Sequence, residues 1–75
     1  MHRFLVILER TAEGFSAYAP DLPGCVASGG SREEAEKSMS RAVELHIRDI
    51  IEKGLPIPEP RSIAEYVAVQ EESGS

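Results

Sequence analysis

Few residues of this sequence have the type and spacing that catalysis or metal binding requires. Cys25 is the one cysteine, and it has neither an adjacent base nor a CxxC partner to activate a nucleophilic thiolate. His46 could ligate a metal, but His2 and Cys25 are its only obvious co-ligands, and their spacing matches no ligand pattern. We therefore interpret Cys25 as a small buried residue and His46 as part of a core or dimer interface, and we predict no cofactor and no metal site.

The most distinctive polar residue is Asp21, within the run Pro20-Asp21-Leu22-Pro23-Gly24. One interpretation is purely structural, because Asp, Pro and Gly are the residues that a tight turn needs, and Pro23-Gly24 fits the centre of a type II turn. The other is an exposed, rigid loop that presents Asp21 and Leu22 to a basic partner, since prolines reduce the entropy lost on binding. The sequence leaves both interpretations open.

Composition and charge restrict the kind of protein. Seventy-five residues allow one small domain, which we place at residues 1–70, followed by a frayed polar end at 71–75. Thirteen acidic against eight basic side chains give a formal net charge of −5, which disfavours nucleic-acid binding and favours a basic partner. The longest apolar run, Phe4 to Leu8, is too short to span a membrane, and a single cysteine suits a reducing compartment. We therefore expect a cytoplasmic protein with no membrane segment.

The hydrophobic pattern predicts three strands, one helix and a further strand. Apolar alternation and turn residues predict strands at residues 3–10, 15–19, 25–28 and 63–70. Apolar residues then recur at helical spacing and predict a helix from about Arg32 to about Lys53.

Local signals mark the turns and the helix ends. Residues 11–14, Thr-Ala-Glu-Gly, are typical of a hairpin turn. Ser31 and Glu34 form a capping-box pattern, and Gly54 followed by prolines is typical of a helix end. Charges of both signs on the helix predict i,i+4 ion pairs, among them Glu33–Lys37 and Glu44–Arg48.

The order β-β-β-α-β predicts an α+β fold in which one helix packs on a four-stranded mixed sheet, with the fourth strand parallel to an earlier one. In the first strand Phe4, Val6 and Leu8 point to one face, and Leu5 and Ile7 point to the other. A strand that is apolar on both faces is usually central and covered on both sides. Because one helix covers only one face, we expect a homo-oligomer, a dimer or a tetramer.

Four stretches follow one another in a distinctive order: YAPDLPGC at residues 18–25, SGGS at 28–31, EEA at 33–35 and GLPIPEP at 54–60. In this order and spacing they resemble the HicB family, and the resemblance covers about residues 3–69. It implies a partial RNase H-like fold, in agreement with the β-β-β-α-β order, and the antitoxin role in a toxin–antitoxin pair. The partner that it implies is a small basic HicA toxin, which has a double-stranded-RNA-binding-like fold and cleaves mRNA with a histidine.

The sequence departs from longer members of that family, which carry a C-terminal helix-turn-helix or ribbon-helix-helix segment that binds operator DNA. It ends too soon to hold such a segment, so we expect no direct DNA binding. An RNase H-like nuclease would also need an acid in the middle of the first strand, to join other carboxylates around divalent metal ions. Leu5-Val6-Ile7 supply none, although Glu36, Glu44 or Glu65 could supply others, so we predict a protein that is not an enzyme.

The leading hypothesis is an antitoxin that neutralises a HicA-type toxin by covering its active surface. We predict Tyr18, Asp21, Leu22 and Pro23 as its partner-binding residues. The alternative is a stand-alone oligomeric scaffold or a small-ligand-binding module with no toxin partner. A neighbouring gene for a small basic protein would favour the first.

Overall fold

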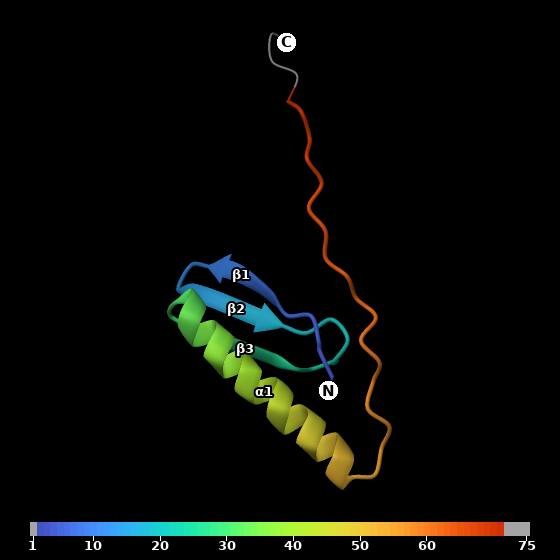
Figure 1. Ribbon diagram of the computed structural model, residues 1–75. Helices are drawn as coiled ribbons and strands as arrows, with labels where there is room; N and C mark the ends of the chain where they lie inside the picture. Colours follow the sequence, from blue (N-terminus) through green and yellow to red (C-terminus); the bar gives the residue numbers. More distant parts are fainter. Residues whose placement is uncertain (1, 72–75) are drawn as a thin grey trace.

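Three strands form an antiparallel meander in the sheet order β1-β2-β3. The strands are β1 at Ile7–Thr11, β2 at Gly14–Tyr18 and β3 at Val26–Gly29. In the computed structural model, which describes residues 2–71, a single helix, α1 at Arg32–Glu52, lies across one face of this sheet (Figure 1). The fold is therefore α+β, as predicted, and its first four elements follow the predicted order.

A thin core lies between the sheet and α1. The predicted facing of the first strand is confirmed, because Phe4, Val6 and Leu8 all pack against this core. Among the described residues, the only large side chains that are fully buried belong to Leu22 and Met39. The buried apolar residues of this part of the chain are Ala17, Ala19, Leu22, Cys25, Ala35 and Met39. Most of them are small, so the sheet and the helix approach closely but bury little apolar area.

Both ends of α1 are closed by local hydrogen bonds. The Ser31 hydroxyl accepts the Glu34 N–H at 3.2 Å, as the capping-box pattern predicts. The Glu34 carboxylate reaches back one residue further than that motif requires and accepts the Gly30 N–H at 3.1 Å. At the other end Gly54 adopts a φ of +68°, and the two N–H groups after the C-cap donate to carbonyls of the last turn, as in a Schellman motif.

Three exposed ion pairs with i,i+4 spacing line the outer surface of α1. The predicted pair of Glu44 and Arg48 forms at 3.1 Å. The other two are Arg32–Glu36 at 3.9 Å and Asp49–Lys53 at 3.0 Å, in place of the predicted Glu33–Lys37 pair. Exposed pairs of this kind contribute little to stability, so the helix depends mainly on its caps and its buried face.

The predicted fourth strand is wrong for this chain. Residues 55–71 leave α1 as an extended segment that runs past the sheet and beyond it (Figure 1), and within the described chain no backbone group of residues 63–71 bonds to another backbone group. The sheet therefore has three strands and is wholly antiparallel, not four-stranded and mixed. Alternation indicates an extended conformation, but a strand also needs a hydrogen-bonded neighbour, which this segment lacks.

The missing fourth strand changes the position of β1. The predicted strand at 3–10 begins only at Ile7, and β1 lies at an edge of the sheet, not in its centre. We call residues 63–71 the C-terminal arm. Because the arm projects, the radius of gyration is 15.9 Å, whereas a compact chain of this length has about 11 Å. Of the predicted frayed end at 71–75, residues 72–75 lie outside the described residues.

A methyl group at Gly29 should destabilise the fold, because β3 ends directly against the start of α1. A Cβ atom there would lie 2.5 Å from the Ala35 backbone nitrogen and 2.8 Å from atoms of Glu34. We expect Gly29→Ala to lower the free energy of unfolding by about 1–3 kcal/mol, the usual cost of overpacking, as measured by urea denaturation.

Gly30→Ala is the matched control, since its Cβ would meet its nearest neighbour, Glu34 Oε2, at an ordinary 3.5 Å. We expect it to change the free energy of unfolding by less than about 0.5 kcal/mol. Equal destabilisation by the two substitutions would contradict a close approach specific to Gly29.

Candidate partner-binding surface

The loop that follows β2 is made of two successive turns. The Leu22 N–H donates to the Ala19 carbonyl at 3.0 Å, and the Cys25 N–H donates to the Leu22 carbonyl at 3.0 Å. Gly24 has a φ of +80°, the value that a type II turn requires at its third residue, in agreement with the predicted turn. The Leu22 side chain is fully buried, so the loop is fixed both by its own hydrogen bonds and by the core.

Asp21 projects from this loop and holds a distant part of the chain. Its Oδ2 atom accepts the backbone N–H groups of Arg61 and Ser62, each at 2.9 Å. Its Oδ1 atom accepts the Ser62 hydroxyl at 2.8 Å. Hydrogen bonds to an ionised carboxylate are stronger than neutral ones. Asp21 therefore fixes the two residues that come directly before the C-terminal arm.

These contacts also shift the ionisation of Asp21. The backbone N–H groups of Ser62 and Arg61 lower the pKa of the Asp21 carboxyl, because they stabilise its charged form. The Ser62 hydroxyl and the positive charge of Arg61 act in the same direction, while partial burial opposes them. Asp21 is therefore ionised at neutral pH and keeps its bonds to residues 61 and 62.

The four predicted partner-binding residues differ in their exposure. Leu22 is fully buried beside Met39, so the expectation that the loop presents Leu22 to a partner is wrong. A large aliphatic side chain gains more from a small core than from an exposed position. Pro23 is exposed, Asp21 is half-buried, and Tyr18 is 37% exposed.

Asp21 and Pro23 contribute to a pocket of about 610 Å³ between the loop and the chain that follows α1. We call it the proline pocket, and its lining residues are Pro20, Asp21, Pro23, Pro58, Glu59 and Arg61. The sequence did not predict that Pro58, Glu59 and Arg61 line this pocket, because no local pattern connects residues some 40 positions apart. The one signal was the presence of two proline-rich runs that each contain an acid.

Tyr18 lies outside the proline pocket, on the outer face of the sheet. The strand register aligns it with Ile7 on β1 and Val26 on β3. Residues directly opposite one another on neighbouring strands share a face, so these three form an apolar row across the sheet. Val26 is 65% exposed and Tyr18 is 37% exposed, whereas Ile7 is half-buried.

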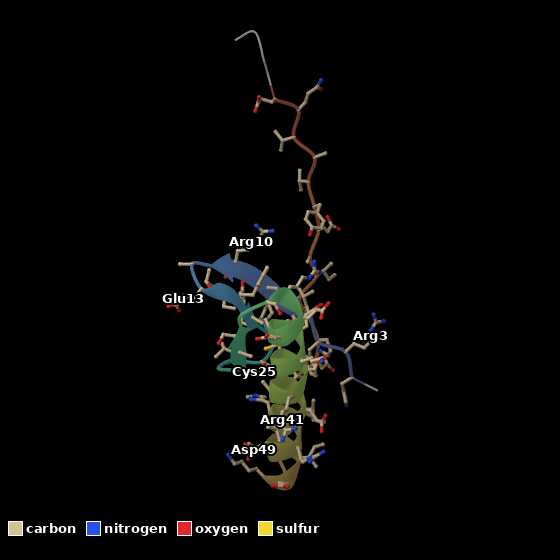
Figure 2. The ribbon with its side chains drawn as sticks, turned by 90° about the vertical axis from the view of Figure 1, so that its left-hand side faces the viewer. Arg3, Arg10, Glu13, Cys25, Arg41 and Asp49 are labelled. Atoms are coloured by element: carbon tan, nitrogen blue, oxygen red, sulfur yellow. The ribbon has the colours of Figure 1, made fainter. Side chains whose placement is uncertain are left out.

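The residues considered for chemistry are not gathered into a reactive site. Cys25, labelled in Figure 2, lies on the loop that leads into β3. Its side chain is 4% exposed, and burial raises the pKa of its thiol, so the interpretation of Cys25 as a small buried residue is confirmed. His46 is half-buried on α1. Among residues 2–71, no three His, Cys, Asp or Glu side chains lie together where they could hold a metal ion. In the same range, no helix combines the length and the apolar character that crossing a bilayer requires.

Together these features define a small α+β domain with a rigid loop and an exposed apolar row on the sheet. The chain belongs to the HicB-like antitoxin family, because the family profile described as "HicB_like antitoxin of bacterial toxin-antitoxin system" matches residues 4–75. The resemblance found in the sequence motifs is thereby confirmed.

Individual relatives support this assignment. The UPF0150 protein ssr1765 of Synechocystis sp. is 30% identical over 70 residues, which are 92% of this chain and 89% of the relative. An uncharacterized 14.9 kDa protein of Haemophilus phage HP1 is 27% identical over 62 residues, which are 83% of this chain and 47% of the relative. The chain therefore spans most of one relative and about half of the other.

Two solved structures share the fold. A chain of the HicA3 and HicB3 toxin-antitoxin complex matches with a TM-score of 0.66 and 30% identity, over 79% of this chain and 70% of that one. The crystal structure of antitoxin HicB3 matches with a TM-score of 0.64 and 32% identity, over 76% of this chain and 42% of that one. The α+β arrangement described above is thus similar to that of HicB.

The attachment of the C-terminal arm should depend on the charge of Asp21. A carboxyl with a lowered pKa in the folded state stabilises that state above its unfolded pKa, about 3.9, and the contribution is lost as the pH falls through the lower folded pKa. We expect the amide protons of Arg61 and Ser62, followed by NMR, to shift with a midpoint below that of an ordinary aspartate.

Asp21→Asn is the control for this titration. It keeps the size of the side chain but removes the charge, so the pH-dependent shift of both amide protons should disappear. A midpoint at or above the ordinary aspartate value, or a shift that persists in Asp21→Asn, would contradict the assigned hydrogen bonds.

Proposed function

We propose that this chain is an antitoxin that binds a small, basic, RNA-cleaving toxin of the HicA type. Membership of the HicB-like antitoxin family carries the proposal. It is supported by the likeness to a chain of the HicA3 and HicB3 toxin-antitoxin complex. The net charge of −5 supports it as well, because opposite net charges accelerate the encounter of two proteins.

The antitoxin neutralises its toxin by covering the toxin's active surface. Occlusion requires no chemistry from this chain, so the proposed role is not enzymatic. It requires a surface that is rigid before binding, since ordering a mobile surface costs affinity. The proline pocket meets this requirement, because three of its lining residues are prolines and Asp21 ties its two halves together.

The contacting residues have different roles in this proposal. Pro23 and Tyr18 contact the toxin, and Leu22 supports the loop from inside the core. Asp21 already accepts three hydrogen bonds and therefore positions the pocket. Glu59, which is exposed at the rim of the pocket, is the acid that pairs with a basic toxin residue. We propose that this binding takes place in the cytoplasm, by a homo-oligomer.

The direct test mixes the purified chain with the product of a neighbouring gene that encodes a small basic protein. Calorimetry measures whether the two proteins bind, and an RNA-cleavage assay measures whether binding stops the partner. We expect a complex and a loss of cleavage at equimolar antitoxin. A partner that binds but keeps cleaving RNA, or that does not bind, would favour a stand-alone scaffold or ligand-binding module and contradict the proposal.

The place of contact is tested by two substitutions that each remove one negative charge. Glu59→Gln changes the rim of the proline pocket, whereas Glu13→Gln changes the tip of the β1–β2 hairpin (Figure 2). We expect Glu59→Gln to weaken toxin binding by about 0.2–1 kcal/mol and to reduce its salt dependence, as loss of an exposed pair does. Glu13→Gln should leave both unchanged. Equal effects of the two substitutions would mean that only net charge matters.

A further inference from the structure

The C-terminal arm carries exposed apolar side chains in the alternating pattern of a strand. The exposed fractions are 85% for Ile63, 105% for Tyr66, 80% for Val67 and 84% for Val69. Successive residues of an extended chain point to opposite sides, so both faces of the arm are apolar. A single exposed apolar residue needs no explanation, but a contiguous series of them marks an interaction site.

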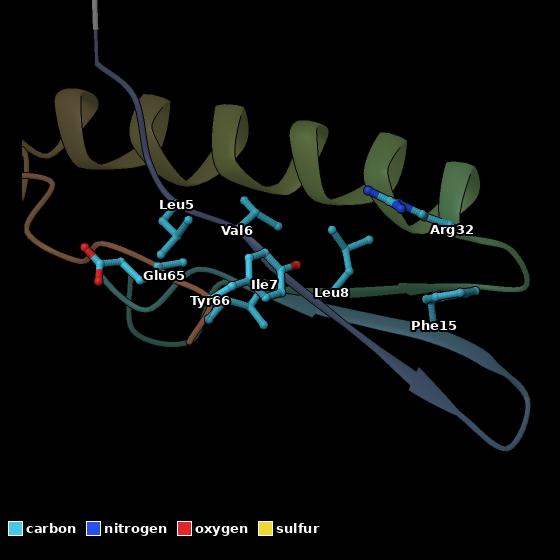
Figure 3. Close-up of a pocket in the computed structure, with 9 residues that line it drawn as sticks. Leu5, Val6, Ile7, Leu8, Phe15, Arg32, Glu65 and Tyr66 are labelled. Atoms are coloured by element: carbon cyan, nitrogen blue, oxygen red, sulfur yellow. The ribbon is translucent and has the colours of Figure 1, made fainter. Parts of the chain in front are cut away.

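The edge strand β1 offers the complementary surface. Figure 3 shows Val6 and Leu8 pointing toward α1 and Ile7 pointing to the opposite side, so apolar side chains lie on both faces next to this edge. A pocket of about 440 Å³ runs along residues 5–8 and reaches Arg32 at the start of α1. An edge strand also presents a row of unpaired N–H and C=O groups, which another strand can bond.

The arm of the same molecule passes this pocket without filling it. Residues 64–66 contribute to the lining of the pocket, but within the described chain the arm forms no backbone hydrogen bond with β1. The Tyr66 side chain is fully exposed and therefore does not pack against the apolar surface beside it. The edge of β1 and the arm are therefore two matching, unused strand surfaces in one molecule.

We propose that the C-terminal arm of one molecule pairs with the β1 edge of a second copy, and that the second arm pairs in return with the first molecule. The result is a strand-exchanged dimer with two equivalent contacts. This inference goes beyond the proposed antitoxin function and requires no toxin.

The direction of the arm favours a second copy over the molecule's own edge. Asp21 fixes the chain at Arg61 and Ser62. Residues 64–66 then pass the pocket beside residues 5–8, without a backbone hydrogen bond to β1 in the described chain, and the rest of the arm runs away from the sheet (Figure 1). The longest dimension of the molecule, 59 Å, reflects this projection. In a dimer with twofold symmetry both projecting arms are paired, because the contact between one arm and the other molecule's β1 edge is repeated by the symmetry.

Charge also favours this pairing. The arm contributes only acids, Glu65 and Glu71, among its charged side chains. The chain along the β1 edge carries two basic residues, Arg3 and Arg10, against one acid, Glu9, while Arg32 at the pocket already pairs with Glu36 on α1. Opposite charges on the two surfaces steer the arm to the edge and oppose the pairing of two arms with each other.

Sedimentation velocity of the full chain without toxin, across the micromolar range, tests the proposal. We expect a dimer that dissociates on dilution. Val67→Pro removes a backbone donor from the arm, and Tyr66→Asp places a charge on its apolar face. Both residues are exposed and lie outside the core, so each variant should stay folded by circular dichroism and sediment as a monomer where the parent chain is a dimer.

Val26→Lys is the matched control, because it changes an exposed apolar residue on the outer face of β3, away from the arm and the β1 edge. It should leave the dimer intact. A monomer at every concentration would overturn the proposal, as would a dimer that survives both arm substitutions. Loss of the dimer in Val26→Lys alone would instead assign the contact to the outer sheet face, and it would also overturn the proposal. None of these results depends on toxin binding.

Discussion

One helix covers one face of this sheet, and that constraint determines how the rest of the chain can be used. A domain of this size buries only about 60% of the surface that its unfolded chain exposes. Within residues 2–71, Leu22 and Met39 are the only large side chains that are fully buried. Within the same residues, Val26 on the outer face of the sheet and the apolar side chains of the arm remain exposed. We therefore propose that the stability and the function of this domain both depend on association.

Asp21 connects the small core to the surfaces that lie outside it. The buried Leu22 fixes the loop, the loop positions the Asp21 carboxylate, and the carboxylate holds Arg61 and Ser62. The same hydrogen bonds close one side of the proline pocket and set the direction in which the arm leaves the domain. One side chain thus positions both the proposed toxin-binding surface and the proposed dimer contact. The two surfaces are adjacent but consist of different residues.

The parts of the fold that depend on local sequence could be predicted. Ser31 caps the helix, Gly54 ends it, and Gly24 allows the type II turn, because each of these features is decided by residues within a few positions. The facing of Val6 and Leu8 followed from simple alternation. The family was also recognisable, since its motifs are local runs in a fixed order.

The parts that depend on distant contacts could not be predicted. The arm has the pattern of a strand, but the pattern does not say which strand, or which molecule, supplies its partner. The bond from Asp21 to Ser62 joins residues 41 positions apart, and no periodicity reveals it. Leu22 was assigned to the surface because turn residues usually lie there. Its side chain is buried instead, because it is the one large aliphatic side chain of the loop and so small a core gains from burying it.

The measurement that tests association most directly is the urea unfolding midpoint of the full chain as a function of its own concentration, without toxin. If folding is coupled to pairing with a second copy, mass action stabilises the folded state as the concentration rises. We predict a midpoint that increases steadily across the micromolar range. A midpoint that is the same at every concentration would show that the isolated molecule is stable by itself, and it would contradict the dependence of this fold on association.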